Sequence, residues 1–598
     1  MYTAPIADMR FVLNDLGMLG QVQALPGGED ASSDLVDAVL EEAGKLARDV
    51  LAPTNWDGDR EGAKLENGVV RTPKGFRDAY KAYVEGGWNA VPFQPEHGGQ
   101  GLPWTVASAV QEMWQSANMA WALCPLLNQG AVEALQAHGS PEQQSVYLPK
   151  MISGEWSGTM NLTEPQAGSD LSQVKTRAAR EGDHYRIRGQ KIYITYGEHD
   201  MAENIVHLVL ARCEDAPAGV KGISLFIVPK FLPDETGAPG ARNDLRCVSL
   251  EHKLGINGSP TCVMAYGDDE GAIGYLVGEE NRGLEYMFTM MNNARLNVGL
   301  QGLAISERAY QQARSYALDR RQGRGPDGTP NAPIVSHADV RRMLMTMRST
   351  VEAMRALVLD AMVMLDVAHR HPEEGYRAFA KRRVDLLTPV VKGWCTDMGV
   401  ELSSIGLQVH GGMGFIEETG AAQHYRDSRI LPIYEGTNGI QANDLVGRKL
   451  IRDGGEGVSE YVDELHALIN QLNERGGDDM AVIRRQFANA VDALDNATGY
   501  ILDHAADDPD KAHGAAAYYL RLFGIVAGGG MMVRAAIAAE DKVLRADDGE
   551  TGIDRDFYAA KLATARFYAE NVLPQAAGLS VPIMQGGATL RAIPDEAL

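Results

Sequence analysis

The segment Tyr434-Glu435-Gly436-Thr437 presents one carboxylate where it could take part in chemistry. Glu435 stands between a bulky aromatic residue and a glycine, which lets the backbone turn sharply and leaves room for a flat ligand. Thr437 is expected to cap a helix that follows it, by accepting a bond from a free backbone N–H. A carboxylate presented in this way can act as a general base. From these residues alone, a solvated or helix-capping glutamate is the simpler interpretation.

A second candidate site lies in residues 160–170, which read Met-Asn-Leu-Thr-Glu-Pro-Gln-Ala-Gly-Ser-Asp. A strand that runs into this loop would present Thr163, Gly168 and Ser169 together with several backbone N–H groups. Such converging donors can receive a phosphate or the edge of a heteroaromatic ring. Downstream, residues 191–195 would place an aromatic face and a hydroxyl on one strand. Each segment alone also fits an ordinary strand exit or core packing.

Two further segments lie at predicted helix ends. Residues 408–415 form a glycine-rich interruption without the lysine and spacing of a P-loop, and no strand precedes them as in a dinucleotide fingerprint. Residues 316–322 end a long predicted helix with paired arginines, and most such arginines are solvated or satisfy C-terminal carbonyls. Neither segment alone indicates a function.

The spacing of apolar residues predicts a helical N-terminal region. A helix is expected over 34–51, with Ser33 as its cap and Pro53 as its stop. Further helices are predicted over 75–92 and 105–124, with a glycine-rich turn between them.

The pattern changes between about residues 155 and 280, where short β-branched runs with a period near two predict a compact β domain. The strand signals lie at 184–188, 191–195, 205–210 and 223–228. Long helices are then expected over 284–319, 335–370, 377–405, 437–452, 458–475, 480–505, 514–540 and 554–577. The expected fold class is α+β, mainly α. Four domains are expected: N-terminal helical (1–155), central β (156–282), C-terminal helical bundle (283–454) and an additional C-terminal helical domain (455–598).

Composition restricts the class of protein. The chain has 598 residues, 45% of them hydrophobic and 23% charged, as in a soluble globular protein of about three or four domains. Its net charge of −24 argues against nucleic acid or an anionic membrane as the main partner. Five scattered cysteines without a CxxC pair disfavour a disulfide framework or a zinc site. We see neither a secretory signal nor an apolar run near the roughly 20 residues that span a bilayer. A cytoplasmic protein without integral membrane association is expected.

Together, these segments resemble one family. The order Thr-Glu-Pro-x-Ala-Gly-Ser-Asp, Lys-x-Tyr-Ile-Thr, Asp-Arg-Arg-Gln, Gln-x-x-Gly-Gly-x-Gly and Tyr-Glu-Gly-Thr-Asn-x-Ile-Gln resembles the acyl-CoA dehydrogenase family over about residues 35–450. The α, β, α succession around these motifs is similar as well. The remaining C-terminal residues resemble the larger bacterial members, and residues 2–13 resemble the methylthiopropanoyl-CoA dehydrogenase branch. The resemblance implies the acyl-CoA dehydrogenase fold, with a four-helix bundle as its C-terminal domain, and no metal.

In this family FAD lies between the β domain and the second helical domain. The resemblance implies that the flavin ring and adjoining phosphate contact Met160, Leu162, Thr163, Gly168 and Ser169. Tyr193, Ile194 and Thr195 would support the flavin, with tyrosine where many relatives carry tryptophan. From the neighbouring subunit of a homodimer or dimer of dimers, the residues implied to reach FAD are Arg320, Gln322, Gln408, Gly411 and Gly412. Thr437 and Gly439 complete the implied cofactor contacts. Gly323 departs from a common phenylalanine, so the packing there differs.

Glu435 matches the family's catalytic base, which removes the proton α to the thioester while the β-hydrogen leaves as hydride to flavin N5. Burial beside the flavin and acyl chain would raise its proton affinity. The backbone N–H of Glu435 and a flavin ribityl hydroxyl would polarise the thioester carbonyl. Some relatives carry the base on the first long helix, where this chain has Ala294, which cannot remove a proton. The implied substrate contacts are Ser169, Asn292, Arg295 and Gly436, although Arg295 fits equally well as a brace between the helical domains.

The resemblance implies an FAD-dependent acyl-CoA dehydrogenase that forms a trans-2-enoyl-CoA and passes electrons to an electron-transfer flavoprotein. One alternative is an acyl-CoA oxidase that uses oxygen as the acceptor. Another is a non-catalytic acyl-CoA-binding homologue. The sequence leaves the acyl group open between 3-(methylthio)propanoyl and short or medium straight chains, and it assigns no role to residues 456–598.

Overall fold

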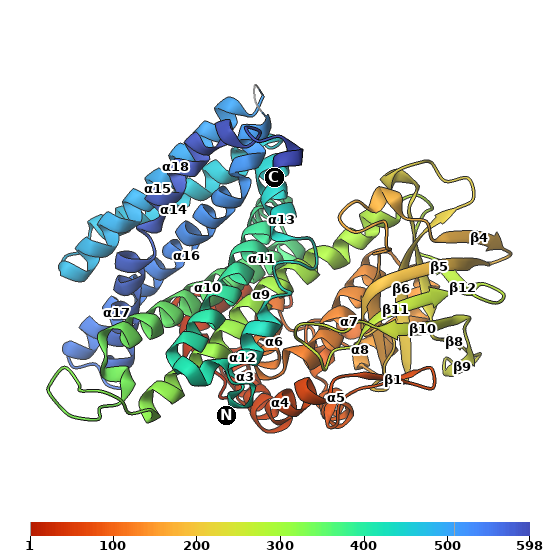
Figure 1. The fold of residues 1–598 in the computed structure, drawn as a ribbon, viewed down its shortest axis with the longest axis horizontal. Coiled ribbons are helices and arrows are strands. Elements are labelled where there is room, and N and C mark those ends of the chain that lie inside the picture. The colour runs from red at the N-terminus through yellow and green to blue at the C-terminus, as the bar shows by residue number, and fades with distance from the viewer. Residues whose placement is uncertain (1, 507–508) are drawn as a thin grey trace. The chain divides into compact units, whose positions relative to one another are not determined.

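A computed structural model describes residues 2–506 and 509–598, which form two compact units. The first unit contains Glu42–Asn297 with the first residues of the chain. The second contains Pro5–Glu41 and Val298–Leu598. Figure 1 shows one β domain among many helices, which confirms the predicted fold class. The four predicted domain boundaries stay a prediction.

Helices and a sheet make up the first unit. Its helices are the end of α3 (Ser33–Leu46), then α4 (Ala52–Glu61), α5 (Phe76–Glu85), α6 (Trp104–Ala117), α7 (Met119–His138), α8 (Pro141–Ser153) and the beginning of α9 (Gly283–Asp319). A hairpin of β1 (Lys64–Glu66) and β2 (Val69–Arg71) follows α4. Helix α8 begins at a capping box, in which Ser140 Oγ accepts from the backbone of Gln143 and the Gln143 side chain accepts from the backbone of Ser140.

The main sheet of this unit has eight strands in the order β10-β11-β5-β12-β7-β6-β3, with β4 beside β5 and β6. They are β3 (Trp156–Asn161), β4 (Arg177–Glu181), β5 (His184–Thr195), β6 (Asn204–Cys213), β7 (Ser224–Pro229), β10 (Leu245–Leu250), β11 (Thr261–Tyr266) and β12 (Ala272–Leu276). A separate hairpin pairs β8 (Phe231–Pro233) with β9 (Pro239–Arg242). Strand β3 runs parallel to β6, whereas β5 runs antiparallel to β11 and β12. Strand β7 is buried throughout, and β6 is buried except at Arg212.

Helix α7 packs against the sheet. A Cβ added to Gly158 of β3 would lie 2.5 Å from Ala131 Cβ of α7, so only glycine permits this close approach. Figure 1 shows α7 and α8 beside the strands. At the other end of α7, Tyr196 Oη donates to the carbonyl of Ala120 at 2.7 Å. Strand β3 and Tyr196, directly after β5, therefore both contact α7.

The second unit is helical. Its elements are α1 (Ile6–Arg10), α2 (Met18–Gln23), the end of α9, α10 (Ala338–Arg370), α11 (Glu374–His410), α12 (Ala421–Ser428), α13 (Asn438–Asp444), α14 (Glu456–Asn473), α15 (Asp478–His504), α16 (Pro509–Asp547), α17 (Arg555–Asn571) and α18 (Gln575–Gln585). Helices α9 and α11 touch at Gly302, where an added Cβ would lie 2.2 Å from the carbonyl oxygen of Cys395. Close backbone contact of this kind fixes how the two helices are positioned along each other.

The C-terminal helices pack directly on the bundle. On α16, an added Cβ at Gly524 or Gly528 would lie 2.2 Å or 2.7 Å from the ring of Trp394 on α11. Helix α16 also contacts α10 and α13. It is long and apolar enough, by length and composition, to cross a membrane, which the sequence analysis did not find; 83% of its apolar window is buried inside the structure, as in a core helix.

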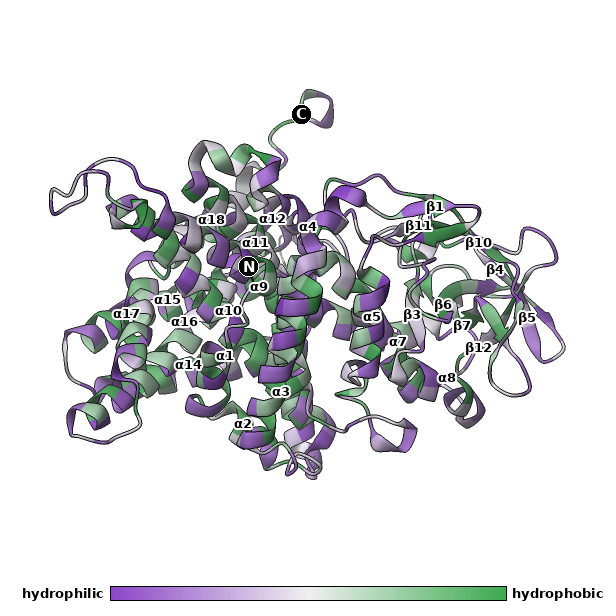
Figure 2. Cartoon of the chain, turned by 90° about the horizontal axis from the view of Figure 1, so that it is seen from below, coloured by the Kyte–Doolittle hydropathy of each residue, from purple (hydrophilic) through white to green (hydrophobic). Residues whose placement is uncertain are grey.

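Several predicted boundaries are wrong. Ser32, rather than Ser33, supplies the cap of α3, since its Oγ accepts from Leu35 N at 3.2 Å. Pro53 does not end the helical run, because a π-helical turn over Ala47–Leu51 leads into α4 with the proline in its first turn. Figure 2 shows hydrophilic and hydrophobic residues alternating along α3 and α5, the amphipathic pattern behind these predictions.

Two other predicted elements differ in extent. The helix predicted over 105–124 is interrupted at Asn118, whose extended backbone and side chain, accepting from Trp121 N, begin α7. Residues 75–92 form the shorter α5, followed by a 3₁₀ turn over Trp88–Ala90. The two strand signals at 184–188 and 191–195 belong to the single strand β5.

Candidate active site

Glu435 lies in a tight turn before α13. Its φ is +55° and that of Gly436 is +84°, so two consecutive residues adopt left-handed backbone conformations. For a residue with a Cβ, this conformation costs of order 1–3 kcal/mol and persists only when neighbouring contacts enforce it. The Glu435 side chain is half-buried. A strained acid at a turn is typical of a functional site.

The turn is held from both sides. Thr437 Oγ1 accepts from Ile440 N at 3.2 Å, which confirms the predicted helix cap. Before the turn, Tyr434 Oη donates to the buried side chain of Gln301 on α9. After it, the buried Gln441 Nε2 points at the carbonyl of Gly436, 3.4 Å away.

Asn438, the first residue of α13, joins this turn to α11. Its Nδ2 donates to Asp397 Oδ1 at 2.7 Å and to the Gly393 carbonyl at 3.0 Å. Its Oδ1 accepts from the buried Lys392 Nζ at 2.8 Å. Burial raises the pKa of Asp397 above its usual range, although the bond from Asn438 opposes that rise. The turn that carries Glu435 therefore rests on a buried polar cluster of α11.

The loop after β3, in the first unit, has its own buried anchor. Glu164 Oε1 accepts from Lys191 Nζ at 2.8 Å and from Thr176 Oγ1 at 2.6 Å. Lys191 Nζ also donates to the Leu162 carbonyl at 2.9 Å. Burial would raise the pKa of Glu164, but the charge of Lys191 and these hydrogen bonds outweigh it and lower the pKa to about 2. Glu164 is therefore an anionic anchor inside the loop rather than a proton acceptor.

The predicted flavin contacts of this loop differ in exposure. Thr163 is half-buried, Gly168 and Ser169 are exposed, and a Cβ at Gly168 would meet nothing within 4 Å. Across residues 2–506 and 509–598, neither the Thr163 nor the Ser169 hydroxyl has a hydrogen-bond partner. Met160 is half-buried and Leu162 is buried.

Strand β5 presents Tyr193 next to this loop. Ile192 N donates to the Thr163 carbonyl at 2.9 Å, which ties the strand to the loop. Tyr193 has a φ of +60° and is 60% exposed, an unusual combination for a large aromatic residue in a strand. The Ile194 side chain packs in the sheet core, so only its backbone is available to a cofactor. Thr195 is half-buried opposite Thr261.

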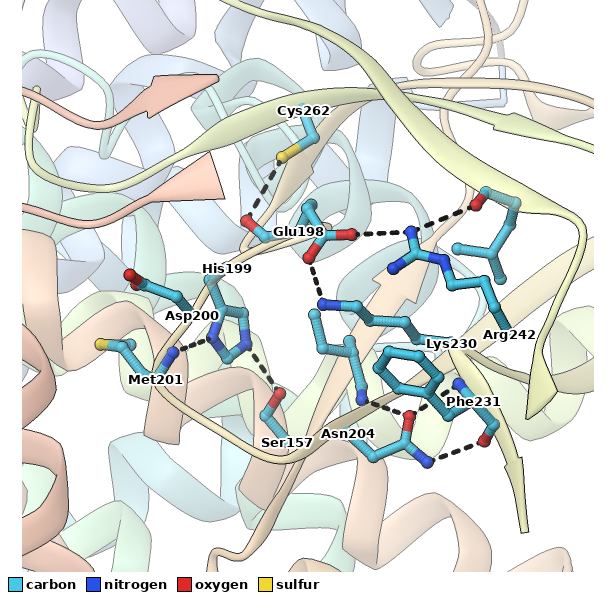
Figure 3. Close-up of polar contacts among 12 residues, drawn as sticks. Ser157, Glu198, His199, Asp200, Met201, Asn204, Lys230, Phe231, Arg242 and Cys262 are labelled. Atoms are coloured by element: carbon cyan, nitrogen blue, oxygen red, sulfur yellow. Dashed lines mark hydrogen bonds and ion pairs between the residues drawn. The ribbon is translucent and has the colours of Figure 1, made fainter. Parts of the chain in front are cut away.

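The segment after β5 is fixed by a buried polar network (Figure 3). Glu198 is fully buried and accepts from Lys230 Nζ and, at 3.2 Å, from Arg242. His199 Nδ1 accepts from Met201 N at 3.2 Å, so its Nε2 carries the proton and donates to Ser157 Oγ at 2.8 Å. Burial and the charge of Lys230 lower the pKa of His199 to about 3, so the ring stays neutral. This network braces β5 and does no proton transfer at neutral pH.

In the second unit, the other two predicted cofactor segments lie side by side. The ring of Tyr316 near the end of α9 stacks on His410 at the end of α11, with centroids 4.5 Å apart. Arg320 and Gln322, which follow α9, Gln408 near the end of α11, and Gly411 and Gly412, which follow α11, are all exposed. In the part of the chain that the structure describes, the side chains of Arg320, Gln322 and Gln408 have no hydrogen-bond partner. Next to them, Phe415 is 89% exposed.

The predicted substrate contacts are placed differently from one another. On α9, Asn292 is exposed, whereas Ala294 and Arg295 are buried. Gly436 is half-buried within the Glu435 turn, and Gly439 is exposed on α13. Ala294 carries no titratable group, so α9 offers no base at that position.

Comparison with known proteins places these sites in a family. Models of the acyl-CoA dehydrogenase N-terminal, middle and C-terminal domains match residues 34–155, 159–268 and 281–450, and a model described as acetyl-CoA dehydrogenase C-terminal like matches 461–594. The 3-methylmercaptopropionyl-CoA dehydrogenase of Ruegeria pomeroyi is 50% identical over 575 residues, 96% of either chain. A broad-specificity linear acyl-CoA dehydrogenase of Mycobacterium tuberculosis is 35% identical over 584 residues, 94% of either chain. The chain belongs to the acyl-CoA dehydrogenase family.

The fold agrees with this assignment. The crystal structure of an acyl-CoA dehydrogenase complexed with FAD from Bacillus anthracis has a TM-score of 0.75 and 21% identity, and the match covers 95% of this chain and 90% of that chain. This acyl-CoA dehydrogenase is an FAD-dependent oxidoreductase. The side chains in each unit fit FAD. In the first unit Thr163 and Ser169 offer hydroxyl groups without a hydrogen-bond partner among the described residues, and Tyr193 offers an aromatic face. In the second unit Arg320 and Gln322 offer guanidinium and amide groups that are likewise without a partner among the described residues.

Sequence reasoning missed the residues that hold these sites in place. Glu164, Lys191 and Asn438 lie inside the motifs that carried the resemblance, yet they were given no role. The sequence shows a glutamate and a lysine in nearby segments, but it does not show that the two side chains are buried against each other as an ion pair. Lys392 and Asp397 carry no signal at all in the sequence, because they look like ordinary residues of a long helix.

Proposed function

We propose that Glu435 is the base that removes the α-proton of an acyl-CoA thioester. The observation that carries this proposal is the left-handed backbone at Glu435 and Gly436, enforced by Asn438 and Tyr434. Such a turn sets the direction of the carboxylate independently of the substrate. A base that is positioned in advance loses little entropy on binding and contributes through proximity.

The other residues bind and orient. Thr163, Ser169 and Tyr193 hold the cofactor in the first unit, and Thr437 and Gly439 contribute beside the base. FAD, when bound, supplies the acceptor for the β-hydride. The Glu435 carboxylate takes the α-proton at one of its oxygens and becomes the neutral acid. The product is a trans-2-enoyl-CoA. In this proposal Asn292 and Arg295 lie near the CoA arm of the substrate, and Gly436 contacts the substrate beside the base.

The electron acceptor in this proposal is an electron-transfer flavoprotein rather than oxygen. The amount of hydrogen peroxide formed per enoyl-CoA distinguishes a dehydrogenase from an oxidase. Turnover should proceed with an added electron-transfer flavoprotein or an artificial acceptor and yield little peroxide. Peroxide equal to the product formed would make the enzyme an oxidase.

The proposed substrate is 3-(methylthio)propanoyl-CoA, with short straight-chain acyl-CoAs as slower substrates. The support is the 50% identity over 96% of the chain to a relative of that name. A panel of acyl-CoA thioesters, assayed with an artificial electron acceptor, tests it. We expect 3-(methylthio)propanoyl-CoA to have the highest kcat/KM, and a clear preference for a medium chain would contradict the substrate.

We also propose a homodimer, or a dimer of dimers, in which the segments after α9 and α11 reach the cofactor of the neighbouring subunit. The apolar residues exposed next to these segments are Leu318, Met413, Phe415 and Ile416. Exposed apolar side chains gathered on one surface are typical of an interface. The exposed Arg320 and Gln322 follow Leu318 in the chain; their side chains have no hydrogen-bond partner among the described residues and would find one in the bound cofactor.

A further inference from the structure

Helices α6 and α7 of the first unit bury an unusual number of polar side chains. Every residue of α6 is buried, among them Ser108, Gln111 and Gln115. Helix α7 buries Asn128 and Gln129. Polar groups inside a helical core cost free energy unless they are hydrogen-bonded. Packing alone does not explain why these two helices bury so many polar side chains.

Some of these side chains link three helices. Gln111 Nε2 donates to Gln129 Oε1, which joins α6 to α7. One turn further along α7, Glu133 is hydrogen-bonded to Asn293 on α9. Asn297 Nδ2 donates to Asn293 Oδ1 at 2.7 Å. We call Ser108, Gln111, Gln129, Glu133, Asn293 and Asn297 the polar cluster.

The polar cluster has hydrogen-bonding capacity that the protein does not fill. Among the described residues, four of its buried atoms have no partner: Ser108 Oγ, Gln111 Oε1, Glu133 Oε2 and Asn297 Oδ1. At least two of the four belong to side chains that are more than nine-tenths buried, with Ser108 fully buried and Gln111 5% exposed. Buried polar atoms in native proteins are nearly always paired with protein, water or ligand. Four such atoms, on neighbouring turns of α6 and α7 and on α9, point to a ligand with a polar atom.

The charge state of the cluster restricts that ligand. Burial raises the pKa of Glu133 to about 8, although the hydrogen bond with Asn293 opposes the rise. At neutral pH Glu133 is therefore mainly a neutral acid whose O–H can donate. No member of the polar cluster carries a positive charge. A buried carboxylate ligand would need such a charge, so the cluster suits a neutral polar atom.

The cluster is close to the flavin-binding side of its unit. Helix α7 packs on β3 through Ala131 and Gly158, and β3 runs directly into the Thr163 loop. The first turn of α7 is bonded to Tyr196, three residues after Tyr193. In the proposal below, the far end of the acyl group lies among the helices that pack against β3 and the residue after β5.

We propose that the polar cluster receives the heteroatom of a short acyl group, such as a thioether sulfur, and selects that group over a hydrocarbon chain of equal length. The proposal rests on the proposed acyl-CoA dehydrogenase function. Glu133 donates to the heteroatom, and Ser108 and Gln111 complete its polar surroundings. A hydrocarbon chain in the same place would leave all of them unpaired.

Two thioesters of equal length test the proposal. 3-(Methylthio)propanoyl-CoA and pentanoyl-CoA differ only in sulfur against methylene. With the wild-type holoenzyme and an artificial acceptor, kcat/KM should favour the sulfur compound by roughly three- to tenfold, the range of one net hydrogen bond. Glu133→Leu and Gln111→Leu should each reduce this ratio towards one, and Glu133→Gln, which keeps a donor, should retain most of it. Gln136→Leu, on α7 outside the cluster, is the matched control and should leave the ratio unchanged.

Each outcome decides the proposal. Equal kcat/KM for the two thioesters in wild-type enzyme would overturn it. So would Leu variants that bind FAD and slow both thioesters by the same factor, since the cluster would then serve folding alone. If Glu133→Leu does not bind FAD, Gln111→Leu and Glu133→Gln carry the comparison. Wild-type holoenzyme that oxidises neither thioester would instead contradict the proposed function.

Discussion

Asn438 donates a hydrogen bond of 2.7 Å to Asp397, and this bond joins the turn that carries Glu435 to the middle of α11. Lys392 approaches the same asparagine from the next turn of that helix, at 2.8 Å. The strained conformation of Glu435 therefore has an identifiable cause. In the proposed reaction, Asn438, which is half-buried, positions the base without contacting the reacting atoms.

Removing this neighbour should slow the reaction more than it weakens binding. Asn438→Ala deletes the hydrogen bonds from Asn438 to Asp397 and from Lys392 to Asn438, at a cost of about 2 kcal/mol. We expect kcat to fall at least tenfold, with a small change in KM and with FAD retained. Steady-state kinetics and flavin absorbance measure both.

Two control variants separate a role of Asn438 in positioning Glu435 from a general loss of folding or stability. Asp397→Asn keeps an acceptor for Asn438 and should remain close to wild type. Asn443→Ala changes an exposed asparagine of the same helix and should have no effect on kcat. If Asn438→Ala raised KM and left kcat unchanged, Asn438 would not position the base.

The ion pair of Glu164 and Lys191 should stabilise the loop after β3. Glu164→Gln leaves Lys191 as a buried charge without its counterion, which costs about 3–5 kcal/mol. We expect a lower thermal midpoint and faster loss of FAD. The double variant Glu164→Gln/Lys191→Met removes both charges and should recover part of the loss, measured by thermal release of flavin fluorescence.

The same pair predicts a pH dependence. The pKa of Glu164 is about 2 in the folded chain and about 4.5 when unfolded, so its contribution is complete above pH 4.5. It is lost as the pH falls from 4.5 towards 2. Wild-type thermal stability should fall more steeply over this range than that of Glu164→Gln. Parallel curves for the two proteins would contradict the assignment.

Replacing Tyr193 by glycine should remove the backbone strain at this position and weaken FAD binding. Tyr193→Gly removes the left-handed penalty of the φ at +60° and should leave stability unchanged or higher. It also removes the exposed ring, so FAD should bind at least tenfold more weakly, as measured by flavin fluorescence titration. Tyr193→Trp keeps an aromatic face and should retain FAD. Unchanged FAD affinity in Tyr193→Gly would show that the ring has no part in the site.

The exposed ring of Phe415 should belong to a subunit interface. Phe415→Ser removes the most exposed aromatic residue beside the Gly411 segment and should raise the dimer dissociation constant at least tenfold. Analytical ultracentrifugation measures this directly. Leu544→Ser, on the exposed side of α16, is the control and should not change the association state. A wild-type monomer at micromolar concentration would contradict the homodimer.

Local patterns predicted the elements, whereas long-range contacts decided the site. Periodicity located β5 and α13, and the Thr437 cap follows from residue type alone. The interruption at Asn118 was not foreseen, because apolar spacing continues through it and only the capping side chain breaks the helix.

The residues that hold the site in place could not be predicted from the sequence, for a physical reason. Glu164 and Lys191 are 27 positions apart, and Asn438 and Asp397 are 41 apart, so only the fold brings each pair together. The burial of the Glu133 carboxyl oxygen could not be predicted, for the same reason. A charged residue in a helix is read as solvent-facing unless the neighbouring helices are known.

The central claim is that Glu435 removes the α-proton, and anaerobic reduction of the bound flavin by substrate tests it most directly. Glu435→Gln keeps the shape of the side chain but cannot accept the proton. We expect this variant to bind FAD as wild type does and to bleach at least a thousandfold more slowly with 3-(methylthio)propanoyl-CoA. Glu418→Gln, an exposed acid in the segment before α12, should bleach at the wild-type rate. Rapid bleaching of Glu435→Gln would contradict the account.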